Sequence, residues 1–471
     1  MRVVFGVFAL GSVVTGAWLW GCGGGDCEPG RQTSCACPGG EQSGVQTCSD
    51  DGAWSDCDCS GAGGTGGTTS TTSSSSTTSS TTGSGGTGGT GGGSGGCAAP
   101  NELCGSDCVD TETDEDHCGE CDNACPAAAT CTNGECDCPG DQIPCGTECI
   151  DGQSDDENCG GCGHDCLTGS CTNGLCPITE LAADLNEPYS LALDATYVYW
   201  FDHAVPTEKI WRAPLGGGTP QELADAGLNP RELLLQGTDL YWSCYGVEGN
   251  NDGEIRKLDL TSATFPATPV VLNSAVEPGG IWGIGLGGGF LYFANQPGLS
   301  VKRLDASTPG AAQPVATNEW NPWDVAADAS HAYWTGYTGG EIRRKPHTTG
   351  AAQTIASGQP SPVGLALSST HVYWASETAN EIRRTPLAGG TIETIATGQS
   401  TPTMLATDST HVYWTNYGNG TVAKAPLEGG PVTVLATGQA NPYGIAVDAT
   451  HAYWTTIANK TPNGTVARTP K

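Results

Sequence analysis

The sequence has little positive charge, little methionine and no recognisable catalytic motif. Its 471 residues include 18 Lys and Arg against 51 Asp and Glu, a formal net charge of −33, and only two Met. Without a basic stripe, nucleic acid and anionic lipid are not expected as partners. No nucleophile elbow lies between a strand and a helix, and HExxH and paired Cys/His motifs are absent.

Long apolar runs are also absent after residue 21. Residues 1–21 have a positive charge at Arg2 followed by an apolar segment, which is typical of an export signal. The segment ends L-W-G-C at Cys22, which resembles the lipobox of bacterial lipoproteins. That resemblance implies that Cys22 is acylated and that the mature chain is lipid-anchored to a bacterial outer membrane, at the cell surface. A secreted protein and an uncleaved membrane anchor are the alternatives.

Cysteine, in contrast, is abundant before residue 178. Residues 22–59 form a small cysteine-rich module, and residues 60–96 contain only Gly, Ser, Thr and one Ala, which predicts a disordered linker. Residues 97–137 and 138–177 are two copies of one frame of eight cysteines, offset by 41 or 40 residues. The frame resembles short cysteine-rich repeats of large secreted bacterial surface proteins.

Each cysteine repeat is too poor in large apolar residues to build a core. We therefore predict four disulfides per copy, with the pairing left open and zinc binding at CxxC as the alternative. The acidic runs 110–116 and 151–157 offer oxygen ligands for Ca²⁺ but lack EF-hand spacing, so we expect solvated loops and no cofactor. Cys244, outside these modules, is expected to be buried and inert.

From residue 178 onward, a unit of about 40 residues repeats. Each copy has an aromatic pair after a short apolar run, and the pairs begin at Tyr199, Tyr241, Tyr292, Tyr333, Tyr373, Tyr413 and Tyr453. Short β-rich segments alternate with Gly, Pro, Asn and Asp, and no copy contains a ten-residue helical pattern. Four short strands per period are typical of a propeller blade. Residues 178–471 are therefore predicted to be all-β, a seven-bladed β-propeller, or six-bladed if the weak copy around Leu286 is degenerate.

The two ends of the repeat region fit together. The seventh copy stops after its third strand, and an unpaired strand, Ile178–Ala182, precedes the first copy. Pairing these two segments would complete the seventh blade and cover an exposed sheet edge.

The repeat resembles the YWTD propellers of low-density-lipoprotein-receptor ectodomains, most clearly in residues 407–430. In those proteins the aromatic pair and the Asp before it hold the blades together, which implies a packing role here. The Asp position is occupied by Asp194, Asp328, Asp408 and Asp448, and is replaced by Gln236, Gly287 and Ser368. Receptor propellers of that family have six blades, so a count of seven is a departure.

Two further positions recur around the ring and are assigned to the scaffold. One holds the histidines His331, His371, His411 and His451; the other holds the cations Arg212, Lys257, Arg303, Arg344, Arg384, Lys424 and Arg468. Equivalent positions of successive blades lie far apart, so the histidines cannot converge on one metal ion.

Function is expected where the copies differ, on the face built by the loops before the first strand and between the second and third strands. The first loops carry Tyr189, Arg231, Trp282, Trp323 and Tyr443, where other copies have Val363 and Thr403. The second loops carry Asp202, His203, Tyr245, Tyr337, Glu377, Asn416 and Tyr417. Aromatic residues with scattered polar groups suit a sugar or peptide ligand, with ordinary packing as the alternative.

Two functions are compatible with this sequence. The first is a monomeric, non-catalytic surface protein whose propeller binds a protein or glycan. The second is a propeller enzyme, a metal-dependent lactonase-like hydrolase or a virginiamycin-lyase type, with Asp, Glu and His from separate loops at the channel mouth.

Overall fold

The structure is a computed structural model that describes residues 32–36, 43–47, 97, 101–203, 207–247, 250, 252–273, 277, 280–457 and 463–471. The chain divides into two compact units, Met1–Gly92 and Gly93–Lys471. In the first unit, β1 (Gln32–Ala36) and β2 (Ser43–Thr47) form an antiparallel pair. The predicted signal segment, Cys22 and the linker lie outside the described residues.

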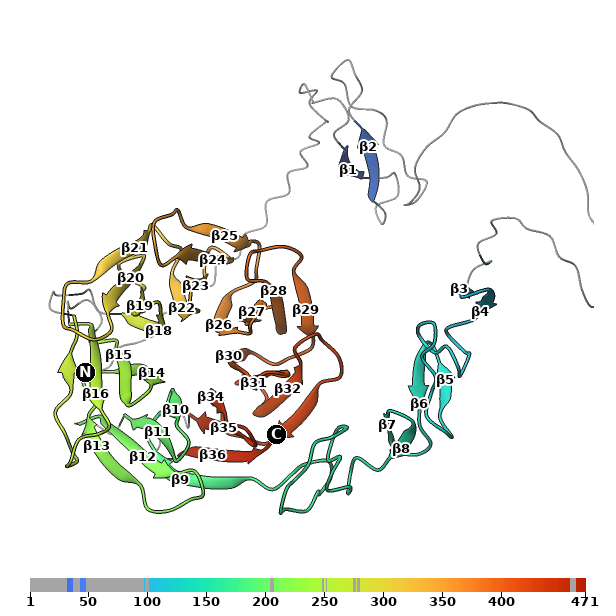
Figure 1. The fold of residues 1–471 in the computed structure, drawn as a ribbon, viewed down its shortest axis with the longest axis horizontal. Helices are drawn as coiled ribbons and strands as arrows, with labels where there is room; N and C mark the ends of the chain where they lie inside the picture. The colour runs from blue at the N-terminus through green and yellow to red at the C-terminus, as the bar shows by residue number, and fades with distance from the viewer. Residues whose placement is uncertain are drawn as a thin grey trace, which may run out of the picture. The chain divides into compact units, whose positions relative to one another are not determined.

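The repeat region forms a ring of seven four-stranded sheets, which confirms the predicted seven-bladed β-propeller (Figure 1). Blades 1 to 3 comprise β10 (Leu191–Leu193), β11 (Tyr197–Asp202), β12 (Lys209–Pro214) and β13 (Gln221–Asp225); β14 (Pro230–Gln236), β15 (Asp239–Cys244), β16 (Glu254–Asp259) and β17 (Val270–Val271); and β18 (Ile281–Gly287), β19 (Phe290–Asn295), β20 (Ser300–Asp305) and β21 (Gln313–Thr317). Blade 3 contains the weak copy, so the six-bladed alternative is wrong.

The remaining blades are more regular. Blades 4 to 6 comprise β22 (Pro322–Ala327), β23 (His331–Gly336), β24 (Glu341–Pro346) and β25 (Gln353–Ala356); β26 (Pro362–Leu367), β27 (His371–Ser376), β28 (Glu381–Pro386) and β29 (Glu393–Ala396); and β30 (Pro402–Thr407), β31 (His411–Asn416), β32 (Thr421–Pro426) and β33 (Thr433–Ala436). Blade 7 joins β34 (Pro442–Val447), β35 (His451–Thr456) and β36 (Gly464–Pro470) to β9 (Thr179–Leu185).

Strand β9 closes the ring, as the unpaired segment before the first repeat predicted. It runs antiparallel to β36, with Thr179 opposite Arg468 and Ala182 opposite Val466. The strand extends to Leu185, beyond the predicted segment, because that side chain is buried in the core of the last blade. The outer edge of β36 is thereby paired within the chain.

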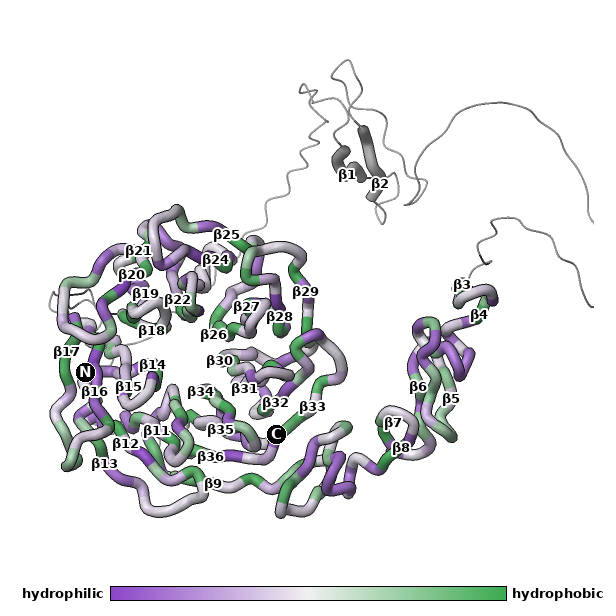
Figure 2. The backbone as a smooth tube through the Cα atoms, in the orientation of Figure 1, coloured by the Kyte–Doolittle hydropathy of each residue, from purple (hydrophilic) through white to green (hydrophobic). Residues whose placement is uncertain are grey.

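The aromatic pairs fill the spaces between neighbouring blades. Successive side chains of a strand point to opposite faces of the sheet, so the two rings of one pair enter two different cores. Tyr373 of blade 5 shares a core with Trp414 of blade 6, and the same relation recurs around the ring. Tyr453 of blade 7 shares a core with Trp200 of blade 1, which completes the series. Figure 2 shows hydrophobic segments in every blade.

The aspartate before the aromatic pair organises the first turn of its blade. In blade 7, Asp448 accepts hydrogen bonds from the N–H groups of Thr450 and His451 and from the hydroxyl of Tyr453. Asp194, Asp328 and Asp408 make the equivalent contacts. The carboxylate thus connects a turn to a buried tyrosine of the same blade.

Where the aspartate is replaced, the tyrosine hydroxyl turns to the next blade. Tyr373 donates to the Leu427 carbonyl at 3.1 Å, and Tyr241 donates to the Ala306 carbonyl at 3.0 Å. In blade 3, the Tyr292 hydroxyl lies 2.7 Å from Nδ1 of His347. Each of these buried hydroxyls therefore keeps a partner, as buried polar groups require.

The repeated cations and histidines have scaffold contacts. Arg344 donates to the Leu387 carbonyl of the next blade at 2.8 Å, and Arg303 donates to the His347 carbonyl at 2.6 Å. The Nδ1 atoms of the four repeated histidines lie 2.7 to 2.8 Å from the hydroxyl of the preceding Ser or Thr. The cations stand on the third strand of each blade, and the histidines begin the second strand.

The two cysteine repeats are held by eight disulfides with the same pairing order. Their strand pairs are β3 (Glu102–Cys104) with β4 (Asp107–Val109), β5 (Thr130–Thr132) with β6 (Glu135–Asp137), and β7 (Ile143–Cys145) with β8 (Glu148–Ile150). The disulfides are Cys97–Cys108, Cys104–Cys121, Cys118–Cys131, Cys125–Cys136, Cys138–Cys149, Cys145–Cys162, Cys159–Cys171 and Cys166–Cys176. The two cysteines of each CxxC bond to different partners, so the zinc alternative is wrong.

The acidic runs of the cysteine repeats and the single cysteine of the ring, Cys244, have structural roles. In the acidic runs, Asp110 and Asp151 each accept the backbone N–H two residues further on, so these carboxylates stabilise turns. Cys244 is buried and has no disulfide partner among the described residues, as predicted. Burial raises the pKa of its thiol, which keeps it in the unreactive protonated form.

Trp414 is fully buried and tests the packing role of the aromatic pairs. Its ring lies in the core between blades 5 and 6, and its Nε1 donates to Gln399 at 2.8 Å. We expect Trp414→Ala to lower the free energy of unfolding by about 3–5 kcal/mol, the usual cost of removing a buried tryptophan. Differential scanning fluorimetry gives the apparent midpoint even if unfolding is irreversible. Trp320, which is 64 % exposed, provides the matched control, and an equal loss in Trp320→Ala would contradict the packing assignment.

Candidate functional site

A β-bulge in the inner strand sets the geometry of the channel mouth. In blade 4, the register between β22 and β23 shifts between Pro322 and Val325, so Trp323 and Asp324 oppose a single residue of β23. The same irregularity occurs in blades 2, 3, 5, 6 and 7. A bulge leaves backbone groups unpaired and redirects side chains, and bulges are frequent beside functional sites.

The first of these two residues lies at the mouth of the channel, and in blade 1, where β10 begins only at Leu191, Tyr189 and Ser190 take the two equivalent positions. Around the ring the residues at this position are Tyr189, Arg231, Trp282, Trp323, Val363, Thr403 and Tyr443. All of them except Arg231 line one cavity of about 330 Å³. The other residues that line it are Glu187, Glu377, Thr401, Met404, Tyr417 and Ile457. The structure therefore brings six of the residues predicted for the ligand face into one cavity wall.

The aromatic residues of the mouth contact one another in two groups. Trp282 stacks on Trp323 with ring centroids 4.5 Å apart, and Trp323 lies 5.2 Å from Tyr337. On the opposite side, Tyr189 meets Tyr443 edge to face at 5.4 Å. Offset and edge-to-face contacts of this kind are the favoured geometries for aromatic pairs. They hold the rings in place while each side chain remains partly exposed.

Among the seven residues at the first bulge position, Arg231 is the cation. Its guanidinium lies over the rings of Tyr189, Tyr245 and Trp282 at 4.8, 5.2 and 4.7 Å. Within the described part of the chain it forms no ion pair, and its Nε is buried without a hydrogen-bond partner. The faces of the aromatic rings, which are electron-rich, are thus its main electrostatic partners.

Three residues predicted for the ligand face do not line the mouth cavity and instead make contacts that position loops. Asp202 accepts a backbone N–H bond at 2.7 Å. His203 is 8 % exposed, and its Nε2 lies 2.9 Å from the Pro230 carbonyl. Asn416 is 2 % exposed and donates to Gln399 at 2.9 Å. These contacts position the loops, and none of the three residues lines the mouth cavity.

The second bulge residue of each blade points toward the channel axis. The residues at this position are Ser190, Glu232, Gly283, Asp324, Gly364, Met404 and Gly444. Large and small residues alternate, except where Gly444 and Ser190 are neighbours, because an odd number of blades cannot alternate completely. Glycine is required where the next blade approaches closely. A Cβ at Gly364 would lie 2.3 Å from the carbonyl oxygen of Thr403.

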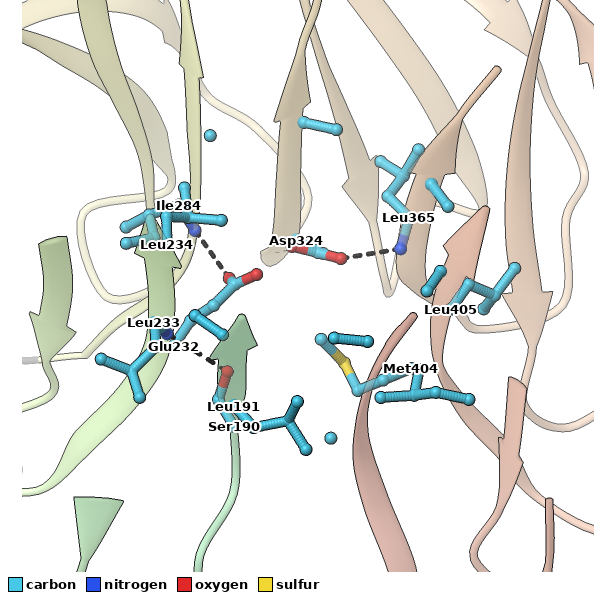
Figure 3. Close-up of a pocket in the computed structure, with 18 of the residues that line it drawn as sticks. Ser190, Leu191, Glu232, Leu233, Leu234, Ile284, Asp324, Leu365, Met404 and Leu405 are labelled. Carbon is cyan, nitrogen blue, oxygen red and sulfur yellow. Dashed lines mark hydrogen bonds between the residues drawn. The ribbon is translucent and has the colours of Figure 1, made fainter. Parts of the chain in front are cut away.

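The two carboxylates reach across these glycines to the next blade. Glu232 accepts a hydrogen bond from the Ile284 N–H at 2.8 Å, and Asp324 accepts one from the Leu365 N–H at 2.7 Å. In both cases the donor is the residue after the glycine of the neighbouring blade. Figure 3 shows Glu232, Asp324 and Met404 extending into the channel, which has a volume of about 640 Å³.

The position of the carboxylates changes their acidity. Burial raises the pKa of Glu232 well above its ordinary value, and the nearby Asp324 carboxylate raises it further. Burial also raises the pKa of Asp324, although the N–H groups of Leu365 and Val325 oppose the change. Two carboxylates close together in a low-dielectric channel do not both ionise readily, so the pair is suited to hold a proton.

Sequence reasoning missed Glu187, Glu232, Asp324 and Met404. Glu232 and Asp324 stand one residue after Arg231 and Trp323, which were predicted for the ligand face, whereas Met404 follows Thr403, which was named only as a contrasting residue. Writing out the residues of all copies at that next position would have shown two acids among glycines, a pattern that local propensity does not explain. Glu187 stands before Pro188 at the position that Asn229, Asn321, Ser361, Thr401 and Asn441 occupy in other copies, so the same alignment would have shown an acid among small polar residues.

Replacing Glu232 tests the state of the carboxylate pair. A carboxylate whose pKa is raised by folding reduces stability once the pH exceeds its unfolded-state pKa of about 4.3, and the cost grows until the pH passes the folded value. Glu232→Gln keeps the acceptor for Ile284 but removes the charge. We expect a higher melting midpoint than wild type at pH 8 and no difference at pH 4. An equal gain at both pH values would indicate a packing effect, and Glu428→Gln, at an exposed position, is the control.

Comparison with known proteins identifies the fold and one short segment. Residues 87–139 match the stigma-specific STIG1-like protein family, and no curated protein matches the chain in sequence. Virginiamycin B lyase from Staphylococcus aureus is similar in structure, with a TM-score of 0.52 and 16% identity over 63% of this chain and 99% of that one. A streptogramin B lyase gives a TM-score of 0.51 and 16% identity, over 63% of this chain and 98% of its own. A nidogen–laminin complex gives a TM-score of 0.40 and 16% identity, over 53% and 97%. At this identity the likeness to the lyases shows a shared propeller fold.

Proposed function

We propose that this protein is a monomeric, non-catalytic binding protein whose propeller recognises a protein or glycan at the channel mouth. The observation that carries the proposal is the variation among the first bulge residues. Four aromatic residues and Arg231 stand at positions equivalent to Val363 and Thr403, whereas the Tyr-Trp packing positions repeat in almost every copy. A position that must fill the same space in every blade keeps its residue, and a position that differs between blades is available for a ligand.

The exposure of the mouth supports this proposal. Its aromatic side chains are partly exposed, and Trp320, in the loop before β22, is 64 % exposed. Aromatic residues that combine an apolar body with a hydrogen-bonding tip are common in binding sites for sugars and peptides. The cavity of about 330 Å³ is at the small end of the range for ligand pockets, which suits one sugar unit or one side chain of a larger partner.

Trp323→Ala tests the mouth as the binding site. We expect the full-length protein to bind a member of a glycan or peptide array, and the variant to bind it at least roughly tenfold more weakly, as for a central aromatic of an interface. Because Trp323 is partly exposed, the variant should lose much less stability than Trp414→Ala in the same melting assay. Undiminished binding would place the ligand elsewhere, and an equal loss of stability would make Trp323 a core residue.

A propeller enzyme is the second candidate, favoured by the Glu232–Asp324 pair. The pKa values of both carboxylates are raised, and they lie beside the mouth. Raised carboxyl pKa values are common in residues that act as general acids or bases. Similar solved structures include lyases named for virginiamycin B and streptogramin B. Conversion of virginiamycin B by this protein, measured by mass spectrometry and abolished in Glu232→Gln, would favour the enzyme.

We also propose that the protein is lipid-anchored through Cys22 at the surface of a bacterial outer membrane. The disulfides of the cysteine repeats support export, because they form and persist in oxidising compartments. None of the described residues belongs to a helix long and apolar enough to cross a bilayer.

Metabolic labelling tests the anchor. Radiolabelled palmitate should enter the wild-type protein, because the proposed modification attaches fatty acid to Cys22. The label should be lost in Cys22→Ser and retained in a matched variant such as Cys27→Ser. Equal labelling of Cys22→Ser and wild type, or a mature N-terminus at another residue, would refute the proposal.

A further inference from the structure

The mouth cavity is aromatic and acidic at the same time. Five aromatic rings line it, those of Tyr189, Trp282, Trp323, Tyr417 and Tyr443. Two carboxylates, Glu187 and Glu377, line it as well, and none of the described residues in its wall is a lysine, arginine or histidine. Two ionisable acids at the edge of the cavity disfavour a neutral apolar ligand, because such a ligand would desolvate them at a cost in free energy.

The two carboxylates come from different blades, and each accepts a tyrosine hydroxyl. Glu187 precedes blade 1 and accepts the Tyr189 hydroxyl at 3.4 Å, whereas Glu377 follows β27 of blade 5 and accepts the Tyr337 hydroxyl at 2.9 Å. Both side chains are partly exposed. The cavity therefore combines two negative charges with an aromatic wall contributed by blades 1, 3, 4, 6 and 7.

Arg231 shows that these same rings accept a cation. The rings of Tyr189 and Trp282 line the cavity and also hold the Arg231 guanidinium at 4.8 and 4.7 Å. The protein thus already places one positive group on the aromatic faces of the mouth, without a carboxylate partner among the described residues. The adjacent cavity has the same kind of wall, with two carboxylates in addition.

We infer that the mouth cavity binds an organic cation, an alkylammonium or guanidinium group. This inference rests on the proposed binding function and specifies the chemistry of the ligand. Cations are attracted to the faces of Trp and Tyr, and the attraction grows as the site excludes water. Residues 178–471 hold 26 Asp and Glu against 16 Lys and Arg, and this negative charge raises the local concentration of cations, while it and the two glutamates repel anions. A lysine or arginine side chain of a partner and a choline-like headgroup share this chemistry.

Paired isosteres test the role of charge. Isothermal titration calorimetry on the full-length protein would compare choline with 3,3-dimethylbutan-1-ol, which has the same shape and no charge. We expect choline to bind roughly tenfold more tightly. Parallel titrations with Nα-acetyl-lysine methylamide and Nα-acetyl-arginine methylamide then identify which cation, and so which kind of source, the cavity prefers.

Two substitutions assign the binding to this cavity. Glu377→Gln keeps the acceptor for Tyr337 and removes the charge, and Trp323→Leu keeps an apolar wall and removes the aromatic face. Each should weaken choline binding several-fold and leave binding of the neutral alcohol unchanged. Glu428→Gln is the control, because that exposed carboxylate pairs with Arg384 away from the cavity, and it should bind choline as the wild type does.

The outcomes separate this inference from the proposed function. If the alcohol binds as tightly as choline, or if no cation binds while an array ligand still depends on Trp323, the inference is overturned and the proposed function stands. If neither the cations nor any array member binds, both are overturned. Choline binding that is unchanged in Glu377→Gln and Trp323→Leu also overturns the inference.

Discussion

The ring depends on one packing contact, repeated at every boundary between blades. A tyrosine of one blade and the tryptophan or phenylalanine of the next share a core. Because neighbouring residues of a strand face opposite sides, a single Tyr-Trp dipeptide supplies both cores beside its blade. The contact is cyclic, so the last tyrosine, Tyr453, needs the first tryptophan, Trp200. Strand β9 completes blade 7 by pairing with β36, and its Leu181 and Leu185 lie in the same core as Tyr453 and Trp200.

Close approach at the axis has a second consequence. The inner strands come so near to one another that alternate blades tolerate only glycine or serine at the second bulge position. The space left by each glycine admits a larger residue from the preceding blade, and this is where Glu232 and Asp324 bond to backbone N–H groups. The carboxylates therefore help to join blades, and their raised pKa values are the electrostatic cost of that position.

Close approach of the inner strands does not restrict the first bulge position in this way, because that position lies at the mouth and not at the axis. There the side chains surround the mouth cavity, and the blades carry aromatic, cationic or small residues without disturbing the ring. The aromatic rings still pack on each other, with Trp282 on Trp323 at 4.5 Å, so the cavity wall is ordered before any ligand arrives. A preorganised wall reduces the entropy that a ligand must lose on binding. The cysteine repeats use another solution, since their disulfides replace a core that so few apolar residues could not form.

The sequence by itself determined the architecture of the repeat region and the division of the chain. Seven blades could be predicted from the period of about 40 residues and the aromatic pairs, because these are local patterns that recur in every copy. Closure could be predicted from the unpaired segment Ile178–Ala182. Eight cysteines per copy were sufficient to predict disulfides, but their pairing was decided by the fold of each repeat. The aromatic mouth residues could be selected because the copies differ there. The tertiary structure alone decided that Asp202, His203 and Asn416 support loops, and that Glu232 and Asp324, ninety-two residues apart in the chain, meet in the channel. Convergence at the axis depends on the rotation between blades, and no spacing within a single copy encodes it.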